Sequence, residues 1–364
     1  ARDGDAPTGH WPTLIAALLY FDCAFMVWVL LGPLAPAIVE ALALSPAQAG
    51  LMVAVPTLSG AMLRVPAGIL ADRIGARRTG AIGQTAVIVA LGTAWTVGID
   101  SFAALLLLGM ALGIAGASFA VALPLVSRWY PPRHQGKVLG IAGMGNSGTV
   151  LAALTAPELA MLYGWRAILG LAVIPLAAVL CLYLLLAREP PERGPRAAAS
   201  DYLRLLRDAD AWALMGFYAV TFGGFSGLAA SLGLMLTQGF GMSIVMAGFV
   251  TAACVFAGSL ARPLGGVLAD RLGGATALAI ALSGAAANMG AAAVVGDRTA
   301  ALPLFLIAMA MLGIGNGAVF QLVPQRFGAR MGSITGLVGM AGGVGGFALS
   351  LSLGLARQWS GSFM

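Results

Sequence analysis

Charged residues are scarce in this sequence, and their scarcity excludes a water-soluble domain. Only 9% of the 364 residues are Asp, Glu, Lys or Arg, whereas a soluble domain carries about 25%. Hydrophobic residues make up 60% of the chain, and the mean hydropathy is +0.93. So few charges cannot cover a surface that faces water. The composition therefore predicts an all-α membrane protein that crosses the bilayer several times.

Lysine, histidine and cysteine are also rare, which removes several functional classes. Nineteen of the 20 basic residues are arginines scattered over the loops, so the net charge of +6 indicates membrane topology and not a nucleic-acid surface. Cys23, Cys181 and Cys254 lie inside apolar runs without metal-ligand spacing, and we interpret them as small core residues. The sequence holds no phosphate-binding loop, nucleophile elbow or metal cluster. We therefore expect no cofactor and no enzymatic activity.

Long apolar runs account for most of the chain. Eleven of them reach the length of about 20 residues that a helix needs to cross a bilayer. The long polar segment between the sixth and seventh runs predicts an N-terminal six-helix bundle at 1–187, a linker at 188–210 and a C-terminal bundle at 211–364. The runs lie at 12–39, 46–70, 78–98, 102–126, 137–160, 166–187, 211–238, 243–268, 275–295, 300–323 and 333–355.

The loop charges and the number of spans give further expectations. Loops that follow even-numbered spans carry 14 Lys and Arg residues, and loops that follow odd-numbered spans carry three. Positive residues favour the cytoplasmic side, so we expect a bacterial-type inner membrane with the N-terminus in the cytoplasm. Six spans, a linker and five further spans imply a twelfth. We expect the natural protein to continue with that helix, because residues 358–364 resemble a turn and its opening.

Two arginines interrupt the apolar runs at matching positions. Arg64 lies eight residues before Asp72, and Arg262 lies eight residues before Asp270, so the two pairs are offset by 198 positions. Eight helical residues place each arginine about 12 Å inside the loop end, near the midplane of a hydrocarbon core about 30 Å thick. A charge at that depth is costly and usually marks a substrate path. Two such charges in parallel repeats predict an anion-binding site between the halves.

Arginine suits a small planar oxyanion. Its guanidinium is a planar fork of donors that stays charged at physiological pH. Two cations about 8 Å apart repel by about 2 kcal/mol at an effective dielectric of about 20, whereas an anion about 4 Å from each gains about 4 kcal/mol twice. Desolvation removes much of this gain, but the sign still favours the occupied site.

The segment GILADRIGARR follows Arg64, and GVLADRLGG repeats it after Arg262. It resembles the loop motif of the major facilitator superfamily. We interpret its residues as gate and fold residues: Gly68 lets two helices touch, Asp72 meets a neighbouring helix N-terminus or arginine, and the arginines anchor at the membrane surface. The gating motif comprises Gly68, Asp72, Arg73, Arg77, Arg78, Asp270 and Arg271.

Two glycine-rich segments repeat at an offset of 196. They are GIAGMGNSGTVLAAL at 140–154 and GLVGMAGGVGGFALS at 336–350, with Gly143 opposite Gly339 and with Gly343 in the second segment. Close helix packing explains such glycines as well as exposure of backbone dipoles to a small ligand does. The glycines alone leave the two explanations open.

Five segments together look like the nitrate/nitrite porter family of the major facilitator superfamily: LRVPAG, LARPLGG, AGMGNSGTV, GNGAVFQLVPQRFG and TGLVGMAGGVGGF. The resemblance runs over 18–359. It implies two pseudo-symmetric six-helix bundles and secondary transport of nitrate, and it leaves open whether nitrite is also accepted. Taken alone, a tyrosine within a span is more typical of an ordinary core or interfacial residue. The pocket that the resemblance implies comprises Arg64, Arg262, Asn146, Tyr218 and Phe222, with Gly143, Gly339 and Gly343 on the glycine-rich helices.

Asp22 is a further charge inside a span. One interpretation is a counter-ion that partly neutralises an arginine. The other is a proton acceptor, because a low-dielectric site disfavours the charged carboxylate. The segment FDCAFMVWVLLG looks like the branch of the family thought to import nitrate with protons, whereas exchangers in the family need no such acid. We favour proton symport over nitrate/nitrite exchange on this residue alone.

Some alternatives remain open at this point. Asn316 and Gln321 line the cavity or bond between helices. The protein is a porter of nitrate or of another small anion such as a carboxylate, or an anion sensor that keeps the fold without transport. A drug exporter is disfavoured, since two midplane arginines suit no lipophilic cation. The expected partners are the anion, protons and lipid, with no nucleic acid, and the expected state is a monomer.

Overall fold

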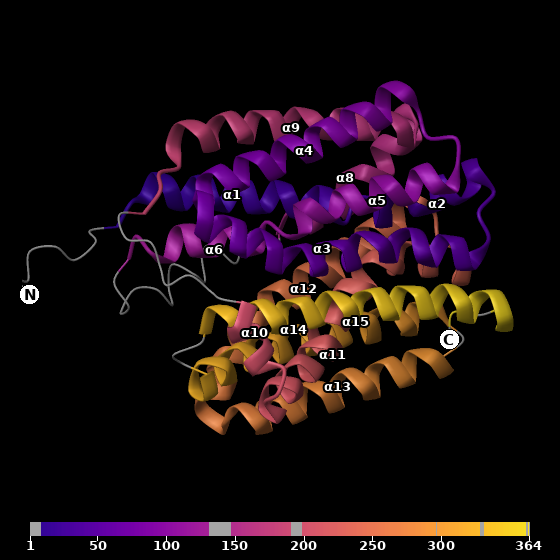
Figure 1. The fold of residues 1–364 in the computed structure, drawn as a ribbon. Helices are drawn as coiled ribbons and strands as arrows, with labels where there is room; N and C mark the ends of the chain where they lie inside the picture. The colour runs from indigo at the N-terminus through magenta and orange to yellow at the C-terminus, as the bar shows by residue number, and fades with distance from the viewer. Residues whose placement is uncertain are drawn as a thin grey trace, which may run out of the picture.

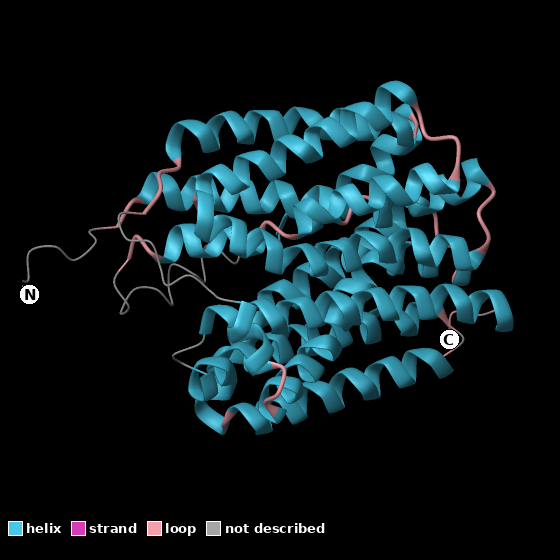
Figure 2. Ribbon diagram, in the orientation of Figure 1, coloured by secondary structure: helices cyan, strands magenta, loops and turns pink. Residues whose placement is uncertain are grey.

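The computed structural model describes residues 9–130, 147–190, 199–295, 297–327, 331–361 and 363. All regular structure in this part of the chain is helical, and no strand occurs in it (Figure 2). The first half comprises α1 Trp11–Trp28, α2 Leu31–Leu42, α3 Pro46–Ile74, α4 Ala76–Val97, α5 Phe102–Gly116, α6 Phe119–Ser127, α8 Gly148–Tyr163 and α9 Trp165–Leu186. The short α10 Ala199–Leu205 follows. The second half comprises α11 Ala209–Leu234 with a π-helical turn Met235–Gly239, α12 Ile244–Leu272, α13 Gly274–Val294, α14 Arg298–Phe327 and α15 Met331–Ser360.

The described helices correspond to ten of the eleven apolar runs, and α8 covers the later part of the fifth run, whose residues 137–146 lie outside the described residues. Ten segments are long and apolar enough to cross a membrane, two of them formed by the pairs α1–α2 and α5–α6, and α8 is a shorter apolar helix. Large apolar side chains cover much of the outside: Leu185, Val97 and Leu107 are 77%, 76% and 64% exposed. Such a surface suits lipid and not water. The interpretation of the cysteines as core residues is wrong for Cys181, which is exposed on α9.

The two halves lie side by side (Figure 1). The indigo and magenta helices of the first half form one group, and the orange and yellow helices of the second half form the other. The groups meet mainly where α3 packs on α15, α8 on α12, and α2 on α11, and α3 also contacts α11. The site described below is built around α3, α11, α12 and α15.

Two glycines turn the chain at one end of the bundle. Gly75 ends α3 and begins α4 with φ +102°, and Gly273 does the same between α12 and α13 with φ +86°. Only glycine adopts such values readily. Both glycines belong to the repeated loop motif, so we call this end of the molecule the motif end. The far end is the one at which α2 passes into α3, where Ser45 and Gln48 form a capping box.

Glycines bring the halves into backbone contact at the far end. A Cβ added to Gly354 of α15 would lie 2.7 Å from the Cα of Gly50 of α3. A Cβ on Gly32 would lie 2.7 Å from the carbonyl oxygen of Ala230, and one on Gly248 would lie 2.7 Å from that of Ala153. Small residues permit this close approach of membrane helices. All three contacts join the first half to the second.

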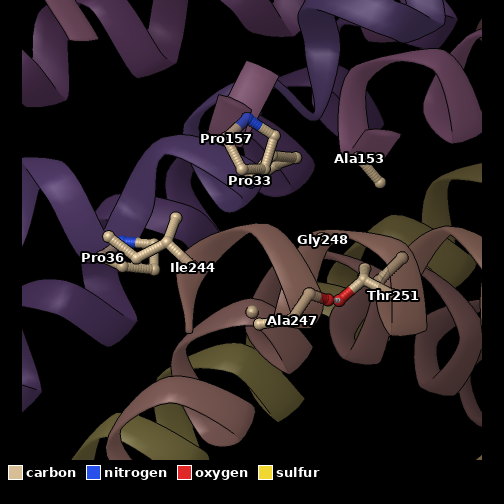
Figure 3. Close-up of a pocket in the computed structure, with 10 residues that line it drawn as sticks. Pro33, Pro36, Ala153, Pro157, Ile244, Ala247, Gly248 and Thr251 are labelled. Atoms are coloured by element: carbon tan, nitrogen blue, oxygen red, sulfur yellow. Dashed lines mark hydrogen bonds between the residues drawn. The ribbon is translucent and has the colours of Figure 1, made fainter. Parts of the chain in front are cut away.

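The space that remains between the halves at the far end is small. A cavity there has a volume of about 10 Å³. Figure 3 shows it between Pro33 and Pro157 on one side and Gly248 and Thr251 of α12 on the other. The hydroxyl of Thr251 donates to Ala247 of its own helix at 2.7 Å. A cavity of this size has room for about one water molecule. The halves are therefore closed against each other at this place.

Candidate functional site

The two arginines of the repeated motifs face the same aromatic ring. Arg64 comes from α3 and Arg262 from α12. The guanidinium carbon of each lies 5.4 Å from the ring centroid of Phe222 on α11. The two positive groups are thus within twice that distance of each other, although 198 positions separate them in the chain. The structure brings them together between the halves, as the matching depths predicted.

Arg64 is enclosed on all sides. It is only 4% exposed, and its guanidinium lies 5.8 Å from the ring of Trp28 and 5.5 Å from that of Phe119. Its Nη1 donates to the carbonyl of Gly339 on α15, and its Nε donates to that of Gly116 at 3.5 Å. Arg64 therefore links the two halves through a backbone oxygen.

Arg262 is surrounded differently. Its guanidinium lies 5.1 Å from the ring of Phe225, but its Nε and Nη2 are buried without a hydrogen-bond partner among the described residues. Buried donors are nearly always satisfied in folded proteins, so unpaired ones call for an explanation. The three ion pairs in the described part of the chain involve neither Arg64 nor Arg262. The site therefore holds two positive charges that no described carboxylate neutralises.

Tyr218 and Phe222 form an aromatic wall. Their rings are stacked with centroids 5.1 Å apart and an interplanar angle of 4°, and the edge of Phe320 meets Tyr218 at 5.0 Å. Both rings of the stack are 4% exposed. A Cβ on Gly342 of α15 would lie within 2.8 Å of both rings. Tyr218 is thus part of the core and of the lining of the site at once.

The two glycines named on α15 have different surroundings. Gly339 offers its carbonyl to Arg64, and a Cβ there would lie 3.2 Å from Nη1 of that arginine. At Gly343 a Cβ would overlap Ala61 of α3 and come within 3.0 Å of the carbonyl of Thr57. Gly343 therefore serves helix packing, whereas Gly339 also exposes its backbone to the site. Gly143 and Asn146 lie outside the described residues.

Comparisons with known proteins agree with this arrangement. The chain matches the family model of the Major Facilitator Superfamily over residues 16–350. It is 35% identical over 355 residues to "Probable nitrate/nitrite transporter NarK2" of Mycobacterium tuberculosis, covering 95% of this chain and 89% of that protein. It is 32% identical over 341 residues to "Nitrite extrusion protein" of Bacillus subtilis, with 93% and 85% covered. The chain belongs to the nitrate/nitrite porter family of the major facilitator superfamily.

Two further matches support the family and the fold. "Probable nitrate/nitrite antiporter NarK1" of Thermus thermophilus is 32% identical over 376 residues, covering 94% of this chain and 84% of that protein. A solved structure of a bacterial homologue of the human lysosomal transporter Spinster superposes with a TM-score of 0.75 at 21% identity, over 96% of this chain and 84% of that one. This likeness shows the fold alone. The names of these relatives describe transporters and an extrusion protein, and none of the names describes an enzyme.

The residues of the repeated loop motif, for which a gating role stays a prediction, make polar contacts at the motif end. Asp72 accepts from Nη2 of Arg128 at 2.9 Å, and Asp270 accepts from Nε2 of Gln321 at 3.1 Å. The expected helix contact at Gly68 is not found among the described residues, because an added Cβ would meet no atom within 4 Å. Arg73, Arg78 and Arg271 are exposed, as anchoring at a membrane surface requires.

Glu189 and Tyr202 add contacts that the motif did not predict. The carboxylate of Glu189 accepts from the backbone N–H groups of Ala76 and Arg77 at 3.2 and 2.8 Å and so caps the start of α4. On α10, Tyr202 hydrogen-bonds with Ser333 at the start of α15, and burial, helped by the nearby Asp72 carboxylate, raises the pKa of its phenol. Tyr202 thus connects the linker helix to both halves.

Asp22 lies apart from the two arginines. Its Oδ1 accepts from the hydroxyl of Ser147 at 2.6 Å, and the backbone N–H of Gly148 at the start of α8 also donates to the carboxylate. No ion pair joins Asp22 to Arg64 or Arg262. The geometry therefore gives no support to the counter-ion interpretation, and the role of Asp22 as proton acceptor stays a prediction.

Four residues of the site were missed by the sequence analysis: Trp28, Gly116, Phe119 and Phe225. Trp28, Phe119 and Phe225 each lie well inside an apolar run. Counting residues from the loop ends, as was done for the arginines, could therefore have placed these three rings at the depth of the site. Gly116 gave no such signal, because it contributes a backbone oxygen where α5 ends. The chain changes to tighter turns between α5 and α6, with Ser118 donating to Ala115 and Ala120 donating to Ala117.

Proposed function

We propose that this protein is a secondary transporter of nitrate, with nitrite also accepted, that works by alternating access. The observation that carries the proposal is the pair of arginines, unneutralised by any described carboxylate, at one aromatic ring between the halves. A small planar oxyanion has oxygen acceptors in one plane, and these match the planar donors of both guanidinium groups. The family and the names of the relatives point to the same anions.

The two arginines have different tasks in this proposal. Arg262 keeps two buried donors without partners and is the first to gain from an anion. Arg64 already donates to Gly339 of the other half, so an anion must compete with that carbonyl. Exchange of a backbone oxygen for a charged ligand favours the ligand, since hydrogen bonds between charged partners are the stronger ones. Loss of the Arg64–Gly339 contact would then remove a hydrogen bond between α3 and α15 and so couple binding to movement of the halves.

The sides of the membrane follow from the loop charges. The motif end carries the arginine-rich loops, and we assign it to the cytoplasm of a bacterial-type inner membrane, with the N-terminus on the same side. The far end then faces outward. Residues 1–187 and 211–364 would be the two moving bundles, and 188–210 the linker between them. Transport requires that the far end opens while the motif end closes around the filled site.

Proton coupling is the finer part of the proposal, and Asp22 is its candidate. Half-buried near the start of α8, this carboxylate accepts hydrogen bonds from neutral donors only among the described residues. Binding of a proton to this carboxylate, and its release as the halves move, would give symport. The alternative is nitrate/nitrite exchange, which needs no titrating acid.

Flux through proteoliposomes separates these possibilities. We expect labelled nitrate uptake to rise with an inwardly directed proton gradient, and Asp22→Asn to abolish this rise while leaving exchange against internal nitrite. Glu158→Gln, at an exposed carboxylate of α8, is the matched control and should keep the rise. Proton-driven uptake that persists in Asp22→Asn would make Asp22 structural. Nitrate binding without any flux would instead indicate a sensor, and flux of carboxylates but not nitrate would overturn the assigned substrate.

A further inference from the structure

Asn316 on α14 is a buried polar residue without a role in the site as described so far. Its side chain is 2% exposed, and neither Nδ2 nor Oδ1 has a hydrogen-bond partner among the described residues. An amide buried in this way costs free energy twice, once for each group. Buried polar groups without partners are uncommon in folded proteins, and a ligand bound in another state is one explanation for them.

Asn316 lies on the face of α14 that packs against α11 at the level of the site. One turn further along α14, Phe320 packs against Tyr218. One turn earlier, Leu312 lies 3.1 Å from where a Cβ on Gly224 of α11 would be. Residues four apart share one face of a helix, so Asn316 lies between these two contacts. This is the level of Phe222, the ring that both arginines contact.

The repeat of the two halves places Asn316 beside Arg262. In the first half α3 and α5 cross where a Cβ on Gly113 would lie 2.7 Å from the nitrogen of Gly60. In the second half α12 and α14 cross in the same way at Gly258 and Gly313. Each arginine lies four residues beyond its crossing, and Gly116 and Asn316 both lie three residues beyond theirs, within the matching segments LGIAG and LGIGN.

The partner of the arginine differs between the halves. Arg64 donates its Nε to the carbonyl of Gly116, which is available because α5 ends there. In the second half α14 is continuous, so its carbonyls are used within the helix, and the Nε of Arg262 remains unpaired. The backbones also touch here, since a Cβ on Gly317 would overlap the carbonyl of Arg262. Gly116 supplies a backbone oxygen to Arg64 in the first half. At the equivalent position of the second half, Asn316 supplies a side-chain amide in the region of Arg262.

We infer that Asn316 contacts the transported anion and selects for nitrate. In the anion-bound state its Oδ1 would accept from the guanidinium of Arg262, whose Nε and Nη2 are unpaired in this structure, and its Nδ2 would donate to an oxygen of the anion that Arg262 holds. Nitrate has three oxygens in one plane, so two guanidinium forks and one amide can each engage a different oxygen, whereas nitrite has only two. A third donor therefore favours nitrate. The inference rests on the proposed function, because it concerns the same site.

Isothermal titration of the purified full chain with nitrate and with nitrite tests the inference. Asn316→Leu keeps the size of the side chain and removes its hydrogen bonds, and we expect nitrate binding to weaken about tenfold, the worth of a hydrogen bond to a charged group. Nitrite binding should change much less. Asn316→Asp should abolish nitrate binding at neutral pH, because its carboxylate would neutralise Arg262. The control is Asn288→Leu on α13, where the amide donates only to Gly284 of its own helix at 2.8 Å.

The melting temperature of each variant is recorded, and Asn316→Ala replaces Asn316→Leu if the latter does not fold. Nitrate affinity within twofold of the wild type in a folded variant, or equal losses for nitrate and nitrite, would overturn the inference. Arg262→Gln distinguishes a failure of the proposed anion site from a failure of the role assigned to Asn316. If it loses nitrate binding while Asn316→Leu does not, only the role of Asn316 is wrong. If the wild type binds neither anion, the proposed function fails and this inference fails with it.

Discussion

The position of Arg64 depends on a tryptophan beneath it. The indole Nε1 of Trp28 donates to the carbonyl of Pro56 at 2.7 Å, and Trp28 is 2% exposed. A Cβ on Gly60 would lie 2.9 Å from this nitrogen, and one on Gly116 would overlap the indole. The ring thus fits between the two glycines that bracket the crossing of α3 and α5. The indole fills the space beside the guanidinium of Arg64 and so holds the guanidinium in its position.

Replacement of the indole should therefore change anion affinity through Arg64. In Trp28→Phe the ring remains but the hydrogen bond to Pro56 is lost, which is worth about 1 kcal/mol. We expect nitrate to bind about fivefold more weakly at a melting temperature close to that of the wild type. Trp212→Phe is the control, because its Nε1 also donates to a backbone oxygen, that of Leu206, at 2.9 Å, but far from the site on an exposed surface. Unchanged nitrate affinity in Trp28→Phe would show that Trp28 only fills space.

At this scale the sequence predicted the charges better than their neighbours. The depths of Arg64 and Arg262 follow from counting residues to a helix end, and the repeat fixes their symmetry. The contacts with Phe119 and with the carbonyl of Gly116 depend on how α5 and α6 cross α3, which no spacing within one segment specifies. The expected contact at Gly68 failed for the same reason. A glycine permits a close approach, but the crossing point decides whether a helix is there.

The helix α15 has two glycine faces, each fitted to a different neighbour. Gly343 lies against Ala61 of α3, in the other half, and Gly345 lies against the carbonyl of Ala219 on α11, in the same half. If the halves move as rigid bodies, the contact of Gly345 with Ala219 within the second half has to persist, while the contact of Gly343 with Ala61 between the halves changes. Packing within a half should thus affect stability, and packing between halves should affect movement.

Gly345→Ala tests the first part of this argument. Its Cβ would overlap the backbone of Ala219, so α11 and α15 must separate, and overpacking of this kind costs about 1–3 kcal/mol. We expect a lower melting temperature in detergent. Gly290→Ala on α13 is the matched control, since an added Cβ there meets nothing within 4 Å among the described residues and alanine favours a helix by about 0.5–1 kcal/mol over glycine. Equal melting temperatures for both variants would contradict the argument.

The helices themselves were predicted well, and their interruptions were not. Hydropathy located ten segments that are long and apolar enough to cross a membrane, because a lipid-spanning helix must be apolar over most of its length. Only the part of the fifth run from residue 148 onward lies in the described structure, as α8. It did not show the break between α1 and α2 at Val29 and Leu30, nor the π-helical turn after α11. Such breaks change hydrogen bonding without changing polarity. A hydropathy pattern depends on side chains alone and therefore does not detect such breaks.

The molecule is closed at its far end by contacts of glycines with the backbone of the opposite half. At Gly354 and Gly50 the helices α15 and α3 touch along their backbones. Three residues beyond Gly50 on α3, Val53 is 2% exposed and lines a cavity of about 10 Å³ that Gly354 also lines. A larger side chain at Gly354 has no room in this arrangement. It should act as a wedge that favours the state in which the far end is open.

We expect Gly354→Leu to expose Val53. In a chain whose three cysteines are replaced by alanine, Val53→Cys reports accessibility through its rate of reaction with a maleimide. The wedge should accelerate labelling of the purified protein at least about tenfold, a shift of about 1.4 kcal/mol in the balance of the two states. Gly290→Leu adds the same side chain on α13, away from the contact between the halves, and should leave the rate unchanged. Rapid labelling without the wedge would show that the far end is not closed in solution, and protection despite the wedge would show that Gly354 does not hold the halves together.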